Sequence, residues 1–425
     1  MRRRVCRASL VNSTLWTNGR GGRYGPPVHR PGALAIRDPA VGISLEGLLE
    51  RYQFTANRRR NRDCSRSDLP RISKWNCRTS HQRCGFPRSL RRSVVAAPLV
   101  LPLPAPPRPK SSVASNMNVL IIKLGAAGDV VRTTTLLRRL DGQITWLTQA
   151  KNTVLLEGVK EGLKCVCWEQ RNQTKGTLYD LVINLEDTQE IGSFLKLLEY
   201  KQLFGAYLGS GNSLRYTDDS RPWFDLSIIS RYGKQQADQL KYENRRTYQE
   251  LIFEGLGWRF EGERYCLPEP TKTGLKGDVA IAPQAGPIWP MKNWAYYDDL
   301  ERTLKRNGLI VNVLPKRSSV LEHLGDVSNH RCLVSGDTLP MHLALGSEVR
   351  CISLFTCTSQ WEIHDYGLQR KIVSPLIKEF FYKRGFAERA TSAITLEEVA
   401  TAVLEQLDAA SKPNAVPVGF ISMAE

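Results

Sequence analysis

Short apolar runs alternate with amphipathic stretches from residue 117 onward, which is the pattern of an α/β protein. Residues 119–123 form an unbroken apolar, β-branched run, typical of a strand that is buried on both faces of a parallel sheet. Residues 129–140 then repeat apolar positions at helical spacing. The same reading predicts strands at 143–148, 178–185, 202–208, 278–282, 309–314, 332–335 and 350–355, and helices at 191–200, 247–258, 296–306 and 395–407. Alternating strands and helices imply parallel sheets.

A break in this alternation divides the chain into two halves. Residues 266–277 hold Pro268, Pro270 and two glycines, which interrupt regular elements and indicate an interdomain linker. We therefore expect a first domain over 117–270, a second domain over 276–408 and a frayed tail over 409–425. Inside the first domain, the aromatic stretch 209–245 predicts mainly loop. Two domains of these lengths are of ordinary size.

The first 116 residues differ sharply from the rest in composition. They hold 23 Lys and Arg against 5 Asp and Glu, while the whole chain holds 60 against 42, so the entire net charge of +18 lies in this segment. No helical or strand period is sustained, and six prolines between residues 98 and 109 indicate a linker. We expect a disordered basic segment. A basic tail, a transit peptide and sequence upstream of a true start are the three interpretations. We favour the third, because Met117 opens directly onto the first predicted strand.

Charge and cysteine content narrow the class of protein. The charges of residues 117–425 balance, so we expect no nucleic-acid partner for this part. No apolar run reaches the roughly 18 residues of a membrane span. The six cysteines of this part are dispersed, and Cys165 and Cys167 are too close together for a usual zinc pair. Reduced thiols in the cytoplasm are therefore expected.

Residues 336–344 predict the end of a strand, a polar turn and the start of a helix. Asp337 and Thr338 are capping residues, and Pro340 suits the first helical position. His342 then falls in the first turn, where the helix dipole favours negative charge. The imidazole fits best if an anion lies between it and the free backbone N–H groups, since helix N-termini bind phosphates. An ordinary capped helix with a solvated histidine is the alternative.

A glycine-containing turn and a carboxylate follow the first predicted strand. Gly125 and Gly128 permit a tight turn and a close approach of the backbone to a ligand. Asp129 lies at the carboxyl edge, where open α/β sheets bind ligands, and a partly dry cleft can raise a carboxyl pKa toward that of a general base. The alternative is a helix N-cap. The spacing is not the dinucleotide fingerprint, and no acidic residue follows the second strand, which argues against an NAD enzyme.

Three motifs, in this order, resemble glycosyltransferase family 9, which includes the ADP-heptose:lipopolysaccharide heptosyltransferases. The first is the initial strand with its glycine turn and Gly128-Asp129, and the second is Lys292-Asn-Trp294 soon after a strand of the second domain. The third is Asp337-Thr-x-x-x-His342. The family usually has glycine after Asp-Thr, where this chain has Leu339, and a Gly-Pro-Thr loop at the place of residues 356–367. The resemblance covers about residues 117–407.

The resemblance implies a GT-B fold, in which two Rossmann-like domains face a central cleft. It implies a metal-independent glycosyltransferase that inverts the anomeric centre and uses no cofactor, with Asp129 as the catalytic base. The donor would be ADP-heptose or a related nucleotide sugar, and the acceptor a cell-envelope glycan or glycolipid. The protein would be cytoplasmic and could contact the inner face of the cell membrane peripherally.

The same resemblance implies roles for residues of the second domain. Lys292, Thr338 and His342 would bind the donor diphosphate. Asp337 would bind the donor sugar, and Glu322 would match a family glutamate that holds the ribose of the nucleotide. For Lys292, the alternative is an ordinary surface lysine.

Other interpretations stay open. In the first domain, Glu186 and Asp187 end a predicted strand and are candidates for the acceptor site, with a solvated strand end as the alternative. A nucleotide-sugar epimerase or dehydrogenase would need a ribose-binding acid and a Tyr-x-x-x-Lys motif, and neither is in place. A nucleotide-sugar-binding protein without catalytic activity is the main alternative to the enzyme.

Overall fold

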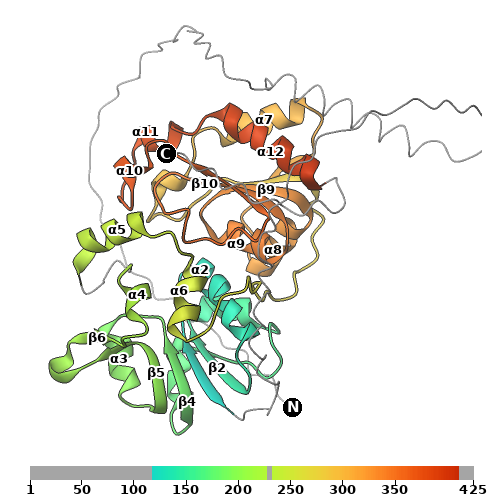
Figure 1. Cartoon of the computed structure of the whole chain (residues 1–425). Helices are drawn as coiled ribbons and strands as arrows, with labels where there is room; N and C mark the ends of the chain where they lie inside the picture. Colours follow the sequence, from blue (N-terminus) through green and yellow to red (C-terminus); the bar gives the residue numbers. More distant parts are fainter. Residues whose placement is uncertain (1–116, 227–231, 411–425) are drawn as a thin grey trace, which may run out of the picture. The chain divides into compact units, whose positions relative to one another are not determined.

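The computed structural model of the chain describes residues 117–226 and 232–410 (Figure 1). The segment 1–116, for which disorder was predicted, lies outside the described residues, as do residues 411–425 of the predicted tail. The described residues form two separate sheets, of six and five strands, in which nearly all neighbouring strands are parallel. Helices pack on both sheets (Figure 1), so the predicted α/β class is confirmed.

The first sheet has the strand order β3-β2-β1-β4-β5-β6. Its central strand, β1, is almost wholly buried and pairs in parallel with β2 on one side and β4 on the other, as its apolar sequence predicts. Only the edge pair β5–β6 is antiparallel among the described strands of this sheet. The strands are β1 (Asn118–Ile122), β2 (Gln143–Thr148), β3 (Lys164–Cys167), β4 (Leu178–Asn184), β5 (Glu199–Leu208) and β6 (Leu214–Tyr216).

The helix predicted over 129–140 is shorter and begins earlier than expected. The α-helix covers Ala127–Thr133 and continues as a 3₁₀ turn over Thr134–Arg138. Three consecutive threonines donate their hydroxyls to backbone carbonyls one turn earlier, a local competition that bends helices. The α-helices of this half are α2 (Ala127–Thr133), α3 (Gln189–Leu195), α4 (Arg221–Phe224), α5 (Gly233–Glu243) and α6 (Tyr248–Gly255), and the 3₁₀ segments are η1 (Thr134–Arg138), η2 (Ala150–Leu156), η3 (Trp168–Thr174) and η4 (Ser210–Asn212).

The second sheet has the strand order β11-β10-β9-β7-β8, and all its described neighbours are parallel. Its strands are β7 (Gly277–Ala282), β8 (Val311–Val313), β9 (His330–Gly336), β10 (Arg350–Phe355) and β11 (Gln369–Val373). The helical segments are η5 (Pro290–Lys292), α7 (Tyr297–Arg306), α8 (Val320–Ser328), α9 (Leu339–Gly346), α10 (Ile377–Phe380), α11 (Glu388–Ser392) and α12 (Leu396–Ala410). Among the described residues, no helix has the length and apolar character needed to cross a membrane.

Several elements were not predicted. The interpretation of 209–245 as loop was wrong for α5, whose eleven residues include few apolar ones and therefore show little helical period. The edge strands β3 and β11 are short and mixed in polarity, so neither shows a clear alternation. The segment between α6 and β7 has no helix or strand, as the predicted linker requires.

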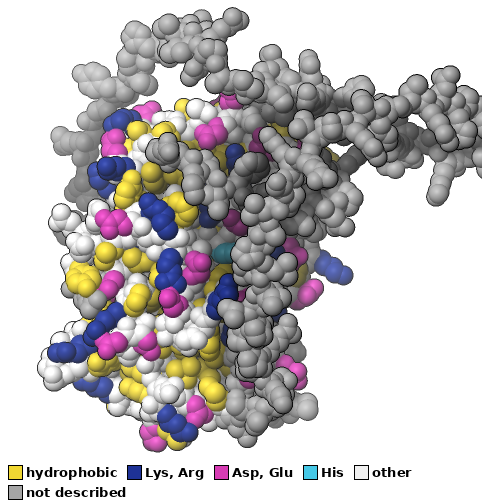
Figure 2. All heavy atoms as spheres, viewed as in Figure 1, with side chains coloured by type: hydrophobic (Ala, Val, Ile, Leu, Met, Phe, Trp, Pro, Cys, Tyr) yellow, Lys and Arg dark blue, Asp and Glu magenta, His cyan; other side chains and the backbone are white. Residues whose placement is uncertain are grey.

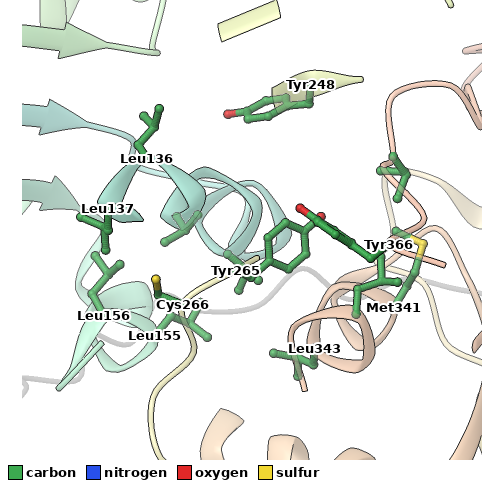
Figure 3. Packing of buried hydrophobic residues seen from close by; sticks show 14 of the residues in the cluster. Leu136, Leu137, Leu155, Leu156, Tyr248, Tyr265, Cys266, Met341, Leu343 and Tyr366 are labelled. Carbon is green, nitrogen blue, oxygen red and sulfur yellow. The ribbon is translucent and has the colours of Figure 1, made fainter. Parts of the chain in front are cut away.

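The largest buried cluster joins the two halves through the segment that connects them (Figure 3). Tyr265, in that segment, packs edge-on against Tyr366 and lies beside the imidazole of His342. The next residue, Cys266, donates its N–H to the hydroxyl of Thr134 at 2.9 Å. This packing holds α2 of the first half against α9 of the second, so the first turns of both helices reach one pocket.

Candidate active site between α2 and α9

A cavity of about 560 Å³ lies between the start of α2 and the loops that follow β7, β9 and β10. Gly128 and Asp129 line it from the first half of the chain. From the second half, it is lined by four residues of the predicted motifs: Lys292, Asp337, Thr338 and His342. Motifs that are far apart in the sequence therefore meet at one cavity.

Asp129 is held by cations on two sides. Its carboxylate lies 2.8 Å from the guanidinium of Arg132 and 3.9 Å from Nζ of Lys123. Burial by itself would raise the pKa of Asp129, but these cations outweigh burial and lower the pKa below its ordinary value. The expected rise in pKa is therefore wrong. The N-cap alternative is wrong too, because Ala126 is the N-cap residue of α2 and Asp129 lies in its first turn.

Glu186 supports the turn that carries Asp129. Its carboxylate accepts the N–H of Leu124 at 2.7 Å and the ammonium of Lys123 at 3.0 Å. Lys123 is only 6% exposed, and it connects Glu186 with Asp129. Glu186 is thus neither a solvated strand end nor, in this structure, turned toward the cavity, since it anchors the β1–α2 turn.

The two glycines of this turn have different surroundings. Neither has a positive φ, so no left-handed conformation requires glycine here. A side chain on Gly128 would place its Cβ 2.7 Å from Cδ2 of His342, well inside normal contact. At Gly125, the nearest atom would be Oε1 of Gln149 at 3.3 Å. Gly128 makes room for the imidazole of the other half and also lines the cavity, so its approach to a ligand stays a prediction.

Lys292 and Asp337 form a buried ion pair on the opposite wall. Nζ of Lys292 donates to the Asp337 carboxylate at 2.8 Å and to its carbonyl at 2.7 Å. The Thr358 hydroxyl donates to the same carboxylate oxygen at 2.8 Å. Burial would raise the pKa of Asp337, but Lys292 and the hydrogen bonds lower it to about 2. Lys292 is 8% exposed, so the surface-lysine alternative is wrong.

Thr338 and His342 form the start of α9. Thr338 is the N-cap residue, although its hydroxyl makes no capping hydrogen bond. Pro340, predicted at the first helical position, is the second residue of α9. His342 is buried, so the solvated alternative is wrong. Burial and the nearby Arg132 lower the pKa of His342 to about 4, and the imidazole is therefore neutral at pH 7. Its Nδ1 lies 3.5 Å from the hydroxyl of Tyr265.

Glu322 lies away from this cavity, in the first turn of α8. Its carboxylate accepts the N–H of Ser319 and the hydroxyl of Ser318, as part of a capping box. Its neighbours Val320 and His323 line a separate cavity of about 340 Å³, which also borders Leu339. In this structure Glu322 caps its own helix, and its role toward a ribose stays a prediction.

Sequence reasoning missed four residues of the main cavity with charged or phenolic side chains. Arg132 stands one helical turn after Asp129, a spacing that could have revealed it. The other three are Lys241 on α5, and Glu362 and Tyr382 in loops of the second half. Their positions depend on how distant segments pack, and no pattern along the chain marks them.

The described residues show charges of both signs and no obvious metal site. No group of three His, Cys, Asp or Glu side chains in residues 117–226 and 232–410 is placed to hold a metal ion. On the face drawn in Figure 2, dark blue and magenta side chains are interspersed over the described part. This distribution agrees with the balanced charge of that part of the sequence.

Three solved structures resemble this chain over most of their own length. E. coli heptosyltransferase WaaC with ADP has 15% identity and a TM-score of 0.44, over 69% of this chain and 99% of that chain. The glycosyl transferase family 9 structure from Veillonella parvula has 14% identity and a TM-score of 0.47, over 70% and 98%. E. coli ADP-heptose lps heptosyltransferase II has 14% identity and a TM-score of 0.43, over 69% and 98%. No family profile matches the chain, and no characterised protein matches it in sequence. At such low identity, function has to be argued from this chain's own residues.

Proposed function

We propose that this protein is a glycosyltransferase that moves a sugar from a nucleotide diphosphate to an acceptor hydroxyl, with inversion of the anomeric carbon. One observation supports this most directly: a single cavity joins the carboxylate of Asp129 to Lys292 and the N-terminus of α9. Displacement of a diphosphate by a hydroxyl needs a base on one side and stabilisation of negative charge on the other.

The wall formed by the second half suits the donor. Lys292 supplies a buried cation, and the first turn of α9 supplies backbone N–H groups and the positive end of a helix dipole. Thr338 and the neutral His342 add hydrogen-bonding groups beside them. Oδ2 of Asp337 is taken by Lys292 and Thr358, while no described residue bonds to Oδ1, which can accept a sugar hydroxyl.

The neighbouring cavity of about 340 Å³ suits the nucleoside. Its walls are largely apolar, with Pro283, Pro315 and Val320 among them, and it also contains polar residues such as Ser319. Leu339 lines both cavities, so a diphosphate at the start of α9 would connect a nucleoside in one with a sugar in the other.

In the proposed reaction, Asp129 accepts the proton of the acceptor hydroxyl while the oxygen attacks the anomeric carbon. The bond from that carbon to the diphosphate breaks, and the departing diphosphate keeps the electron pair. Lys292 and α9 then stabilise its negative charge. Because cations lower the pKa of Asp129, it is ionised at neutral pH but is a weak base. Proton transfer is therefore expected late, when the attacking hydroxyl has become acidic.

The resemblance to glycosyltransferase family 9 supports a particular class of substrates. The proposed donor is ADP-heptose or a related nucleotide sugar, and the proposed acceptor is a glycan or glycolipid of the cell envelope. In this scheme Lys292 and α9 meet the charge of the leaving group, and no metal takes part. A cytoplasmic location, with peripheral contact at the membrane, would suit such an acceptor.

Calorimetric titration of the full chain with ADP, UDP, GDP and then ADP-heptose tests the proposal. We expect selective binding of ADP, weakened at least about tenfold by Lys292→Met or His342→Ala, since a hydrogen bond to a charged group contributes about 1.5–3 kcal/mol. Lys305→Met is the control, because Lys305 pairs with Glu301 on the surface of α7.

Two outcomes would contradict this function. A folded protein that binds none of the nucleotides would exclude the donor site. Binding of ADP-heptose without transfer to any envelope glycan or glycolipid would instead support the nucleotide-sugar-binding protein without catalysis.

A further inference from the structure

We infer that Lys241 and Arg132 form a subsite for an anionic group, a carboxylate or a phosphate, that the acceptor carries near its reacting hydroxyl. This inference rests on the proposed function and deepens it, because it names the chemical class of the acceptor. The subsite lies where the main cavity adjoins a smaller one, beside Asp129.

Lys241 is a buried cation without an ionic partner. It is 6% exposed, yet its ammonium forms no hydrogen bond or ion pair within the part of the chain that the structure describes. Its close contact is the ring of Tyr382, with Nζ 4.0 Å from the ring centroid. Burial lowers the pKa of Lys241. An unpaired buried cation destabilises a fold, so its presence at a cavity points to a ligand that completes it.

Arg132 has spare donor capacity next to Lys241. Its guanidinium bonds to Asp129 and lies 3.9 Å from Glu362, while its Nε is buried without a hydrogen-bond partner. Carbon Cζ lies 3.8 Å from the centroid of the Tyr248 ring, which holds the guanidinium plane in position. A planar guanidinium with free N–H groups is suited to carboxylate and phosphate.

Glu362 is a carboxylate that acts on both cations, and it is already engaged. The hydroxyl of Tyr382 donates to it at 2.8 Å, and Arg132 lies at the edge of ion-pair distance. One carboxylate therefore faces two cations, and Asp129 takes part of the charge of Arg132. An anion bound between Lys241 and Arg132 would balance their remaining positive charge.

The available space fits a small charged group attached to a carbon skeleton. A cavity of about 130 Å³ is lined by Arg132, Lys241 and Glu362, and these three also line the main cavity, so the two spaces adjoin. Its remaining walls are mainly apolar, with Trp223 and Leu251 among them. An acceptor could thus place its anionic group at the cations and carbon atoms against the apolar wall.

The subsite lies next to Asp129, the proposed base. Arg132 contacts Asp129 directly, so an anion bound to Arg132 lies one guanidinium group away from the base. The reacting hydroxyl should therefore be within a few bonds of the anionic group. Such an anion would also draw Arg132 from Asp129, which would return the pKa of Asp129 toward its ordinary value and make it a better base.

Binding of simple sugars to the full chain, with and without ADP, tests the inference. The probes are glucose, glucuronate and glucose 6-phosphate, with inorganic phosphate as a further ligand, measured by calorimetry. We expect at least one acidic sugar to bind about tenfold or more tightly than glucose. Lys241→Met should abolish this preference, Lys241→Arg should keep it, and Lys305→Met should leave it unchanged. The preferred acidic sugar shows whether the natural group is a carboxylate or a phosphate.

Three results would overturn the inference. The first is equal affinity for all three sugars, and the second is a preference that survives Lys241→Met in a protein with unchanged thermal unfolding. The third is inorganic phosphate binding as tightly as the best sugar, which would indicate an ion site only. Intact ADP binding with no acidic-sugar preference refutes this subsite alone. Lost ADP binding with an intact preference refutes the proposed function and, with it, the acceptor role.

Discussion

The first turns of α2 and α9 meet the same cavity, but only the first turn of α2 carries a negative charge. Both helices follow a buried parallel strand, β1 or β9, and both present the positive end of a helix dipole. In α2 that end is complemented by the chain's own carboxylate, Asp129, in the first turn. In α9 the first turn holds no acidic residue. In the proposed function, the unit that carries its own anion supplies the base, and the unit without one binds the phosphate.

Neighbouring charges reinforce this difference. Asp129 lies among the cations Lys123 and Arg132, so it is kept ionised. On the other wall, Lys292 is held by Asp337 in a buried pair that orients the ammonium toward the cavity wall. Each half thus holds its functional charge in place with a partner of opposite sign.

Replacing the proposed base, Asp129, should reduce turnover more than any other single change. Asp129→Asn keeps the size of the side chain but removes its ability to take a proton, so turnover should fall by about 10²–10⁴-fold. Nucleotide affinity should stay unchanged, because α9 and Lys292 are untouched. Single-turnover product formation, with ADP calorimetry as the control, measures both. Near-normal turnover would show that Asp129 is not the base.

The buried imidazole of α9 should make stability depend on pH. His342 has a pKa of about 4 in the folded protein against 6.5 when unfolded, so between these values only the unfolded chain binds the proton. The free energy of unfolding should therefore rise from pH 4 to 6.5, by on the order of 3 kcal/mol from His342, and level off above. Urea denaturation across this range measures the change.

The contribution of His342 to the pH dependence of stability can be measured with His342→Gln. His323 and His364 also have lowered pKa values, so the variant should keep a smaller dependence in the same pH range. Equal pH dependence in the two proteins would mean that the imidazole is already charged, or exposed, in the folded state.

The contact between the two helices can be broken with one methyl group. Gly128→Ala places Cβ 2.7 Å from Cδ2 and 3.2 Å from Nε2 of His342, so we expect a loss of about 1–3 kcal/mol from overpacking. Gly274→Ala is the matched control, since nothing lies within 4 Å of its added Cβ. His342→Ala should relieve part of the loss in the double variant. Equal unfolding free energies for the two glycine variants would contradict this contact.

Much of the fold could be predicted from local patterns of apolar and polar residues in the sequence. The run 143–148 coincides with β2 and the run 350–355 with β10, because apolar and β-branched residues predominate in both. The start of α9 was also predicted, because proline and capping residues act within one turn. The polar helix α5 and the short edge strands were not predicted. They are stabilised by tertiary packing and show no clear hydrophobic period in the sequence.

The candidate site was predicted in part. Asp129, Lys292 and His342 meet at one cavity, as placement at the carboxyl ends of parallel strands implies. The partners of these residues were not foreseen. Lys241 and Glu362 reach the cavity only because α5 and a loop of the second half pack beside it. The spacing of residues along the sequence does not indicate these positions.

By itself, then, the sequence determined the α/β class, most strands and several residues that line the candidate site. These follow from interactions within a few residues of each other, which period and capping reveal. Tertiary structure alone decided the lowered pKa of Asp129, the ion pair between Lys292 and Asp337, and the position of Lys241 at the cavity. The physical reason is that burial and Coulomb interactions depend on distance in space, and the chain brings together groups that its order keeps far apart.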